Sequence, residues 1–343
     1  MIILLEKKAQ KVCYDEIIAF LQKEKINYRP IHANERIVID LSRNVRVLDR
    51  EKLLSFDGVD KVFTDTEPYR LVSRNFIEEN TIIELDLVQI GGETPIVIAG
   101  PCSVESEEQI LEIALLVKAQ GLQILRGGAF KPRTSPYSFQ GLRERGLELL
   151  GKAREETGLY IITEVVDTKD IPMVAQYADI LQVGSRNMRN YELLKAVGRV
   201  NKPILLKRSM SATMKEFLLS AEYVMSEGNT QVILCERGIR TFDDFSRNTL
   251  DLAIVPATQK ITHLPIIVDP SHATGRADLI EPMSMAALAA GAQGLMIEVH
   301  PNPPKSFSDA DQALDPKQFA NLMHRINHYL EWQKAYAKTP HAY

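Results

Sequence analysis

The 343 residues suggest about two domains, and 45% hydrophobic with 25% charged residues is the composition of an ordinary globular protein. The formal net charge of −4 argues against a nucleic-acid-binding protein, whose surface would be broadly basic. Apolar runs fall short of the roughly 18 residues that span a bilayer, so we expect no transmembrane helix and no membrane partner.

The N-terminus and the cysteines both predict a cytoplasmic protein. The chain begins Met-Ile-Ile-Leu-Leu-Glu-Lys-Lys, which lacks the basic segment of a signal peptide and continues as a soluble strand–helix pattern. Its three cysteines, Cys13, Cys102 and Cys235, are an odd and sparse set that fits a reducing compartment. Each thiol is therefore free for packing or for metal binding, and packing is the expectation for Cys13.

Residues 1–68 show the β-α-β-β-α-β pattern of a small ferredoxin-like α+β domain. Its predicted elements are strands over 2–5, 36–41 and 59–63, one further strand near 28–32 or 45–48, and helices over 14–25 and 49–56. This part of the sequence has no cluster of histidines, cysteines or paired acids. Residues 69–94 are predicted to be a linker and a hairpin, because residues 81–90 alternate before two glycines.

From residue 95 to residue 338, apolar strands alternate with amphipathic helical stretches. The predicted strands are Ile96–Gly100, Gln123–Arg126, Tyr160–Val166, Ile180–Gly184, Pro203–Arg208, Val232–Arg237, Pro265–Asp269 and Leu295–His300. The predicted helices cover 107–119, 140–156, 170–177, 189–198, 213–227, 243–251, 281–290 and 316–335. Eight strand–helix units predict a closed (β/α)8 TIM barrel. An open doubly wound sheet is the weaker alternative, because no glycine-rich fingerprint follows the first strand.

Polar or charged residues stand at the carboxyl end of every predicted barrel strand. In a barrel these ends meet at one mouth, where the chemistry of the fold is found. The residues are Cys102, Arg126, Glu164, Arg186, Lys207-Arg208, Glu236-Arg237, His272 and Glu298. Eight such ends after apolar strand interiors indicate one shared functional site.

The second strand leads into the densest group of these residues. Arg126 is followed by two glycines and then by Lys131, Arg133 and Thr134, on a loop stiffened by two prolines. The glycines let the backbone approach a ligand closely, and the cations suit anionic oxygens. A solvated basic loop is the alternative, but the apolar flanks favour a site for phosphate or carboxylate groups.

The strand-end residues form two chemical subsets. One subset is cationic and would repel itself strongly unless an anion lies among its members: Arg126, Lys131, Arg186, Lys207 and Arg237. The other combines the thiol, imidazole and carboxylate ligands of divalent transition metals: Cys102, His272, Glu298 and Asp309. Their spacing is not diagnostic, so a structural histidine and a buried cysteine remain an alternative. Strand ends one, seven and eight are adjacent around a closed barrel, which favours a metal site.

Six motifs in order resemble those of 3-deoxy-D-arabino-heptulosonate-7-phosphate (DAHP) synthase. They are Ala-Gly-Pro-Cys-Ser (99–103), Arg-Gly-Gly-Ala-Phe-Lys-Pro-Arg-Thr-Ser-Pro (126–136), Gly-Ser-Arg-Asn (184–187), Leu-Leu-Lys-Arg (205–208), Cys-Glu-Arg-Gly (235–238) and Asp-Pro-Ser-His (269–272). The chain is similar to the branch related to 3-deoxy-D-manno-octulosonate-8-phosphate synthase, with an added ACT-like regulatory domain. The resemblance implies condensation of phosphoenolpyruvate with erythrose 4-phosphate, the first step of the shikimate pathway to chorismate and the aromatic amino acids.

The same resemblance implies roles for individual residues. It places phosphoenolpyruvate against Arg126, Lys131, Arg186, Lys207 and Arg237, and erythrose 4-phosphate against Arg133 and Thr134. It places one divalent ion (Mn²⁺, Fe²⁺, Co²⁺ or Zn²⁺) on Cys102, His272, Glu298 and Asp309. Glu164 matches an acid near the reacting carbons, and Lys131 is the candidate proton donor. Ser185 and Ala310 depart from the family pattern, which commonly has Ala and Gly there.

The octulosonate synthase is the main alternative activity. Lys131-Pro132-Arg133-Thr134 is the pattern for the short phosphorylated aldose, where the sister family has Lys-Ala-Asn-Arg. A non-catalytic anion-binding barrel would not need Cys102, and a metal-dependent pyruvate aldolase would not release phosphate.

The resemblance also implies control by an effector. It predicts inhibition by tyrosine or phenylalanine, bound where N-terminal domains pair between subunits, and a homotetramer. A plain oligomerisation module is the alternative role for this domain. The sequence does not distinguish which aromatic amino acid inhibits or which divalent ion is resident.

Overall fold

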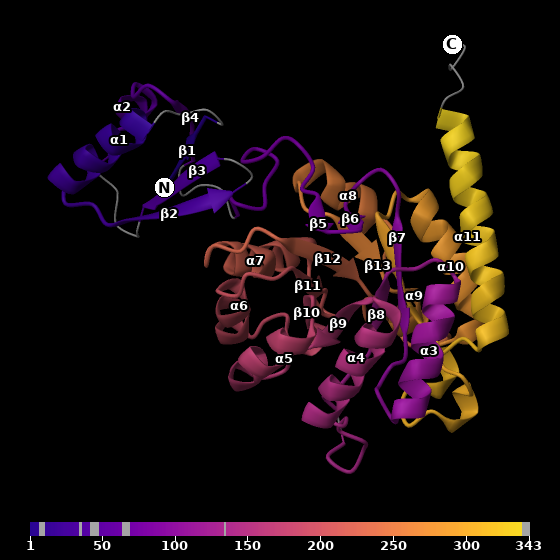
Figure 1. Ribbon diagram of the computed structural model, residues 1–343. Coiled ribbons are helices and arrows are strands. Elements are labelled where there is room, and N and C mark those ends of the chain that lie inside the picture. The colour runs from indigo at the N-terminus through magenta and orange to yellow at the C-terminus, as the bar shows by residue number, and fades with distance from the viewer. Residues whose placement is uncertain (7–10, 34–35, 42–47, 64–68, 134, 338–343) are drawn as a thin grey trace.

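The computed structural model describes residues 1–6, 11–33, 36–41, 48–63, 69–133 and 135–337. They form a small α+β unit beside a β/α barrel, with the long helix α11 (Pro316–Ala337) along the far side of the barrel (Figure 1). The predicted fold class is confirmed by a closed eight-stranded parallel barrel and a separate antiparallel sheet. None of the helices in these ranges has the length and apolar character of a membrane span.

The small unit has a four-stranded antiparallel sheet in the order β2-β3-β1-β4, with two helices on one face. Its elements are β1 (Ile2–Leu5), α1 (Lys11–Lys23), β2 (Tyr28–Ala33), β3 (Arg36–Leu41), α2 (Arg50–Leu54) and β4 (Val59–Phe63). The central strand β1 is apolar throughout because both of its faces are buried. Ile3 and Leu5 pack with the helices, whereas Ile2 and Leu4 join the core that continues into the barrel unit. The strand predicted near 28–32 or 45–48 is β2, at the first of these two positions. Most of 45–48 lies outside the described residues.

A strap from Tyr69 to Ile82 joins the small unit to the barrel and lies against the barrel surface. The Glu222 carboxylate accepts hydrogen bonds from the backbone N–H groups of Arg70, Leu71 and Val72 at 3.0–3.1 Å. Further along the strap, buried His263 contacts Thr81 Oγ1 and Leu71 O, each at 2.7 Å. The strap leads into the two-stranded hairpin β5 (Ile83–Leu85) and β6 (Val88–Ile90).

The barrel closes in the order β10-β11-β12-β13-β14-β7-β8-β9. Its strands are β7 (Ile96–Gly100), β8 (Ile124–Arg126), β9 (Tyr160–Glu164), β10 (Ile180–Val183), β11 (Ile204–Lys207), β12 (Val232–Glu236), β13 (Ile266–Val268) and β14 (Gly294–Glu298). The helices around it are α3 (Glu107–Ala119), α4 (Glu144–Thr157), α5 (Ile171–Tyr177), α6 (Tyr191–Gly198), α7 (Met214–Met225), α8 (Ile254–Ile261), α9 (Pro270–Thr274), α10 (Ala277–Ala289) and α11. Every strand begins and ends within two residues of its predicted bounds.

Two separate cores explain why the barrel strands are apolar on both faces. Side chains that point outward pack with the helices, and those that point inward fill the barrel. The hairpin β5–β6 adds Ile83, Val88 and Ile90 to the inward core, so it closes the end of the barrel opposite the strands' carboxyl ends.

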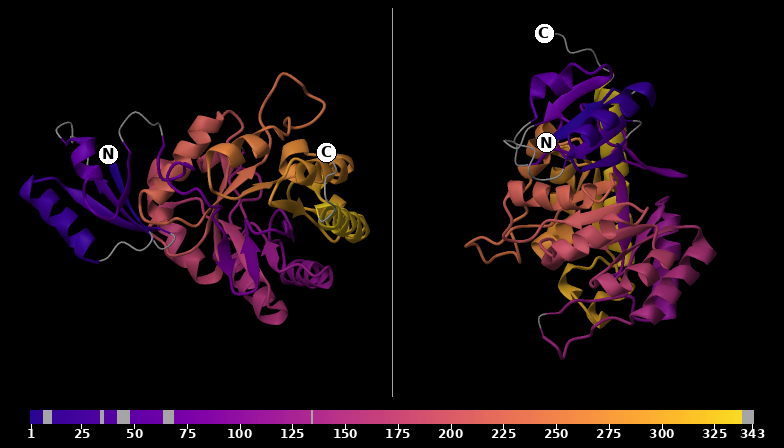
Figure 2. Two further views of the ribbon diagram at one scale, coloured as in Figure 1. Left: turned by 90° about the horizontal axis from the view of Figure 1, so that it is seen from above. Right: turned by 90° about the vertical axis from the view of Figure 1, so that its left-hand side faces the viewer.

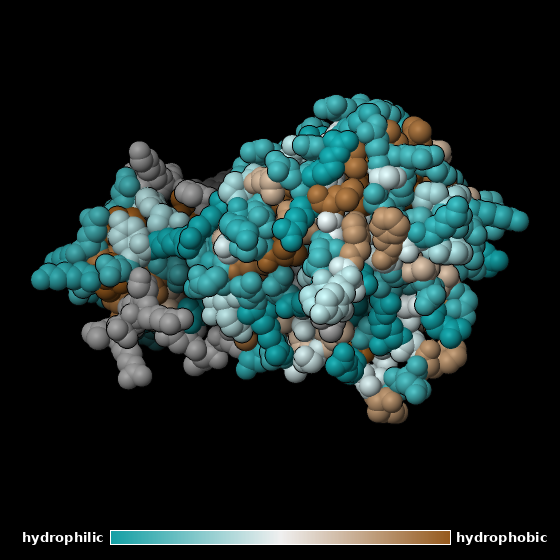
Figure 3. Space-filling model, turned by 90° about the horizontal axis from the view of Figure 1, so that it is seen from below, coloured by the Kyte–Doolittle hydropathy of each residue, from teal (hydrophilic) through white to brown (hydrophobic). Residues whose placement is uncertain are grey.

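The surface that faces downward in Figure 1 carries mainly hydrophilic residues (Figure 3).

The predicted helix over 243–251 is wrong. These residues belong to a long loop after β12, which stands out from the barrel in Figure 2, and α8 follows it. The loop is held by backbone pairing of Ile239 with Thr249 and by side-chain contacts: Asn248 donates to His272 O, and Asp251 pairs with Arg208 at 2.8 Å. These contacts across the chain replace the helical turn that the local pattern suggested.

Candidate active site at the barrel mouth

A cavity of about 480 Å³ lies at the carboxyl ends of the barrel strands. It is lined by nine of the residues predicted for the site: Arg126, Lys131, Arg133, Glu164, Arg186, Lys207, Arg237, His272 and Asp309. Cys102 and Glu298 lie directly beside it, in contact with these residues. The remaining predicted residue, Thr134, is outside the described part of the chain. The structure thus brings together residues separated by up to 207 positions in sequence.

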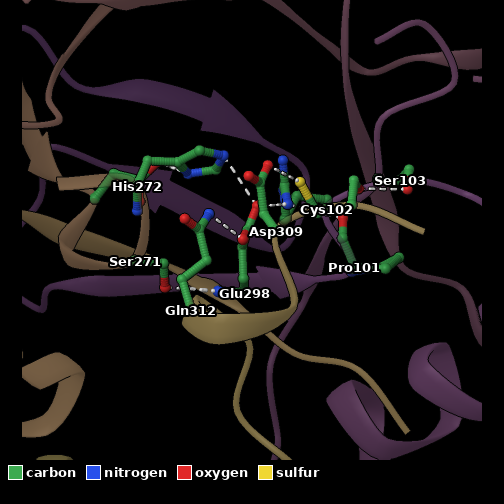
Figure 4. Close-up of polar contacts among 12 residues, drawn as sticks. Pro101, Cys102, Ser103, Ser271, His272, Glu298, Asp309 and Gln312 are labelled. Atoms are coloured by element: carbon green, nitrogen blue, oxygen red, sulfur yellow. Dashed lines mark hydrogen bonds and ion pairs between the residues drawn. The ribbon is translucent and has the colours of Figure 1, made fainter. Parts of the chain in front are cut away.

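Four donor groups converge on one side of this cavity (Figure 4). The Cys102 sulfur, a His272 ring nitrogen and a Glu298 carboxylate oxygen all lie within 4.8 Å of one another. The Cys102 thiol also donates to Asp309 Oδ2 at 3.0 Å. The donors come from the ends of β7 and β14, from α9 and from the loop after β14. Sulfur, imidazole and carboxylate at this spacing suit a divalent transition-metal ion.

The short helix α9 fixes the orientation of His272. Asp269 precedes the helix and caps it, since its Oδ1 accepts from His272 N at 2.9 Å. The other carboxylate oxygen of Asp269 lies 2.6 Å from His272 Nδ1. This leaves Nε2 facing Glu298 Oε1 at 2.9 Å. A carboxylate behind a metal-binding histidine is the usual arrangement that sets its tautomer and its direction.

The charges around His272 favour binding of a cation at this position. Burial lowers the pKa of His272, but the negative charges of Asp269 and Glu298 outweigh it and raise this pKa to about 9. Burial raises the pKa of Glu298, yet the positive charges of His272 and Arg126 hold it below its usual range. The His272 imidazolium is therefore paired with ionised carboxylates, and a divalent ion could replace its proton because a histidine that binds a metal must be neutral.

The cations on the other side of the cavity are partly neutralised by protein acids. Arg126 donates to Glu298 Oε1 at 2.8 Å, and Lys207 Nζ lies 2.5 Å from Asp269 Oδ2. Even so, Arg126 Nε and Arg237 Nη1 are buried with no hydrogen-bond partner among the described residues. Buried donors without partners are rare, so the pair fits an anionic ligand that would accept from them.

Lys131 lies between the anion side and the metal side. Its Nζ is 2.9 Å from Cys102 Sγ and 3.2 Å from Cys102 O. Gly128 allows this approach, because a Cβ there would lie 2.6 Å from Cys102 O and 2.8 Å from Lys131 Cδ. Burial lowers the pKa of Lys131, but its contact with the Cys102 sulfur and the negative charge of Glu298 outweigh burial and raise this pKa. The side chain is therefore an ammonium with protons to donate.

Glu164 reaches the cavity from the end of β9. Its Oε2 accepts from Gln182 Nε2 at 3.3 Å, and its carboxylate packs against the backbone of Gly184. A Cβ at Gly184 would lie 2.0 Å from Glu164 Oε1, so glycine is required for the carboxylate to sit there. Arg186 follows on the short 3-10 turn Ser185–Asn187 and lines the same cavity.

Several residues of this site were not predicted from the sequence. Asp269 contacts both Lys207 and His272, and its position at the end of the seventh strand was the available signal. Arg247 lies 3.1 Å from Asp309 and lines the cavity, but it was hidden inside the wrongly predicted helix. Gln312, which donates to Glu298 Oε2, gave no signal in the sequence.

Comparison with known proteins identifies the family. Residues 77–333 match the model of the DAHP synthetase I family. The chain is 47% identical to the phospho-2-dehydro-3-deoxyheptonate aldolase of Thermotoga maritima, over 95% of this chain and 96% of that protein. It is 31% identical to the 2-dehydro-3-deoxyphosphooctonate aldolase of Syntrophotalea carbinolica, over 66% of this chain and 88% of that protein.

Solved structures give the same result. The crystal structure of the Thermotoga maritima enzyme aligns with a TM-score of 0.77 at 45% identity, over 97% of both chains. A truncated form of that enzyme aligns with a TM-score of 0.73 at 48% identity, over 78% of this chain and 98% of its own. On the family match, the near full-length identity and the shared fold, the chain belongs to the DAHP synthetase I family and is a DAHP synthase.

Proposed function

We propose that the protein condenses phosphoenolpyruvate with D-erythrose 4-phosphate and water, in a metal-dependent reaction that gives DAHP and inorganic phosphate. The observation that carries this proposal is the arrangement of the cavity. Cations with unpartnered buried donors line one side, and a thiol, an imidazole and two carboxylates converge on the other. Two anionic substrates and one divalent ion would satisfy both sets.

The burial of the cations supports an assignment of the two substrates. Arg126, Lys207 and Arg237 are buried at the strand ends, where phosphoenolpyruvate would lie, together with Lys131 and Arg186. Arg133 stands further out on the loop after β8, and with Thr134 it would bind the phosphate of the aldose. Arginine forks suit phosphate and carboxylate oxygens, which accept two parallel hydrogen bonds.

The metal ion would be held by Cys102, His272, Glu298 and Asp309. This donor set accepts Mn²⁺, Fe²⁺, Co²⁺ or Zn²⁺. When bound, such an ion supplies Lewis-acid chemistry to the aldehyde oxygen of the aldose.

The protein groups would carry the remaining steps. The C3 carbon of phosphoenolpyruvate attacks the aldehyde carbon to form the new bond, and Lys131 donates a proton to the former aldehyde oxygen. Water then adds to C2, and phosphate leaves by cleavage of the C2–O bond, which gives the 2-keto product. Glu164 would act near these carbons, since its carboxylate reaches the same cavity.

A phosphate-release assay tests this function. Phosphate should appear in equal amount to the heptulosonate product with phosphoenolpyruvate and erythrose 4-phosphate, should stop on chelation, and should return with Mn²⁺. Activity that survives complete metal removal would contradict the metal dependence. Pyruvate in place of phosphoenolpyruvate should give no product, whereas product from pyruvate would indicate an aldolase instead.

The sister activity is the second candidate, because octulosonate aldolases are also relatives of this chain. Arabinose 5-phosphate offered in place of erythrose 4-phosphate distinguishes the two. We expect the shorter sugar to be preferred because Pro132 and Arg133 follow Lys131. A preference for the longer sugar would transfer the assignment to the octulosonate synthase.

We further propose that an aromatic amino acid, tyrosine or phenylalanine, inhibits the enzyme through residues 1–68 in a cytoplasmic homotetramer. Residues 69–94 would connect this regulatory domain to a catalytic barrel over 95–338. The support is the architecture: the sheet of the small unit packs onto the barrel unit, and the strap is fastened to α7 and to the start of β13.

A further inference from the structure

The loop after β14 holds Asp309 in an unusual backbone conformation. Its φ of 55° and ψ of 41° lie in the left-handed region, and among the described non-glycine residues only Lys25 and Arg143 also have a positive φ. For an L-residue this region is unfavourable because Cβ crowds the following carbonyl oxygen, although aspartate tolerates it better than most residues. The conformation therefore persists because surrounding contacts hold the loop.

Glu105, on the loop after β7, makes three of those contacts. It lies three residues after Cys102, and its side chain is 7% exposed. Its Oε1 accepts from the backbone N–H of Phe307 at 2.9 Å and from Ser306 Oγ at 3.2 Å. Its Oε2 lies 3.3 Å from His300 Nε2.

The neighbours of Glu105 add further contacts between residues 103–105 and residues 300–308. His300 Nδ1 accepts from Asn302 N at 3.0 Å, so Nε2 carries the hydrogen that is donated to Glu105. Ser103 Oγ lies 2.7 Å from Ser308 Oγ and 3.2 Å from Glu105 Oε1. Residues 103–105 are thus joined to residues 300–308 at several points. Cys102 and Asp309 stand immediately outside the joined pairs.

The carboxylate of Glu105 has no part in starting helix α3. That helix is capped by Ser106, whose Oγ accepts from Gln109 N at 3.1 Å. Gln109 in turn accepts from the backbone of Glu105 at 3.1 Å and donates to Ser103 O at 3.0 Å. The local turn is therefore complete without the Glu105 side chain, whose long-range hydrogen bonds go to the Asp309 loop.

We propose that Glu105 is a positioning residue for the metal site, which holds the 300–308 segment so that Asp309 reaches the ion beside Cys102. The inference rests on the metal dependence proposed above and adds a determinant of metal affinity outside the four donors. One oxygen of Asp309 is engaged by Arg247 at 3.1 Å, and the other faces the Cys102 sulfur. Residues that orient metal ligands in this way contribute about 10- to 100-fold to metal affinity.

Co²⁺ titration of the full-length apoprotein tests the proposal. Cobalt bound to a thiolate gives a charge-transfer absorption band, which reports binding at Cys102 without any assay of activity. Glu105→Ala should weaken Co²⁺ binding measured by this band about 10- to 100-fold. Glu107→Gln is the matched control, since that carboxylate is exposed and pairs with Lys152, and it should bind cobalt like the wild type.

A double-mutant cycle separates positioning from general destabilisation. If Glu105 acts through Asp309, then Glu105→Ala should weaken cobalt binding much less in an Asp309→Ala background than in the wild type. If the losses of cobalt affinity in the two single variants add in full in the double variant, the proposal is overturned. It is also overturned if the Glu105→Ala variant folds and binds cobalt with the affinity of the wild type. Should that variant fail to fold, Glu105→Gln and Ser306→Ala apply the same test, and wild-type affinity in both would overturn it. Absence of cobalt binding by the wild type would instead overturn the metal dependence itself.

Discussion

Cys102 is the residue on which the contacts of the mouth converge. Its sulfur is close to Lys131 and Asp309, and it forms the donor group with His272 and Glu298. Sulfur is a soft ligand, which suits Cys102 for binding a divalent transition-metal ion. Under the proposed function, Lys131 would lie within reach of an aldehyde oxygen bound at the metal site.

Replacement of Lys131 by Met should abolish turnover, because the proposed donor to the aldehyde oxygen is lost. We expect the rate of phosphate release to fall by about 10²- to 10⁴-fold. Metal content, measured on the purified protein, should stay at the wild-type value because Lys131 is not one of the four donors. Lys152→Met, which alters an exposed lysine on α4, is the control. Near-normal turnover of Lys131→Met would rule out the assignment.

His263 predicts a pH dependence of stability. Burial, helped by the charge of Arg74, lowers the pKa of His263 from 6.5 to about 4, against the effect of its hydrogen bond to Leu71 O. The native state thus keeps this ring neutral while the unfolded chain takes up a proton below pH 6.5. The free energy of unfolding should therefore fall as the pH decreases from about 6.5 to about 4. At about 1.4 kcal/mol per pKa unit, the loss is about 3 kcal/mol.

Urea unfolding of the wild type and of His263→Gln across this pH range measures the effect. Subtraction of the two curves removes the contribution of other groups, and the remainder should level off below about pH 4. Parallel curves would show that the buried ring does not link protonation to unfolding.

At the scale of residues, the sequence identified groups that stand at strand ends and failed for groups that depend on loops. Arg126, His272 and Glu298 follow from the alternation of strands and helices, since parallel strands of a barrel end at the same mouth. Arg247 and Gln312 reach the site from irregular segments, whose path depends on contacts distant in sequence. No local pattern of residues encodes such a path.

Among the elements, the loop that precedes α8 shows most clearly how tertiary contacts override local preference. Residues 243–251 were predicted to be a helix, yet Asn248 is engaged by His272 on α9 and Asp251 by Arg208, which directly follows β11. The helix begins only at Ile254, three residues after the last of these contacts. Strand bounds were predictable because every barrel strand is a short apolar run between polar segments. Helix α9 was missed because five residues show no periodicity.

The hydrogen bonds of Glu222 on α7 should make a measurable contribution to the free energy of unfolding, because they attach the strap to the barrel. Glu222→Gln keeps one acceptor oxygen for Arg70 and Leu71 but turns an amide NH₂ toward the backbone N–H of Val72. Two donors then face each other, and we expect a loss of about 1–3 kcal/mol in the free energy of unfolding. Chemical denaturation measures it, with Glu192→Gln, an exposed carboxylate on α6, as the control. An unchanged midpoint would mean that water replaces the carboxylate without cost.

For the molecule as a whole, the small unit and the barrel share apolar packing. Ile2, Leu4 and Phe63 belong to one core with the barrel residues, and the rings of Phe63 and Phe76 are 6.1 Å apart. The continuous apolar run of β1 is typical of a strand buried on both faces, but the identity of the surface against its second face depends on the strap and was not predictable from the sequence. The division at residues 68 and 94 stays a prediction, because residues 64–68 lie outside the described ranges.

Deletion of residues 1–68 should leave a barrel that releases phosphate at a rate similar to that of the full chain. The truncated barrel should no longer respond to tyrosine or phenylalanine, because the proposed effector site is removed. Phosphate-release assays with and without each amino acid compare the two proteins. Inhibition that persists in the truncated barrel would place the effector site elsewhere.

The hairpin β5–β6 determines the side from which substrates can enter the barrel. Its apolar side chains close the end of the barrel at the amino termini of the strands. Small polar molecules must therefore enter and leave at the carboxyl ends of the strands. Under the proposed function, phosphoenolpyruvate bound to the buried Arg126 and Arg237 would lie deeper in the cavity than a sugar phosphate bound to the half-buried Arg133. Substrate binding would then be ordered, with phosphoenolpyruvate before erythrose 4-phosphate. Product release would also be ordered, with DAHP leaving before inorganic phosphate.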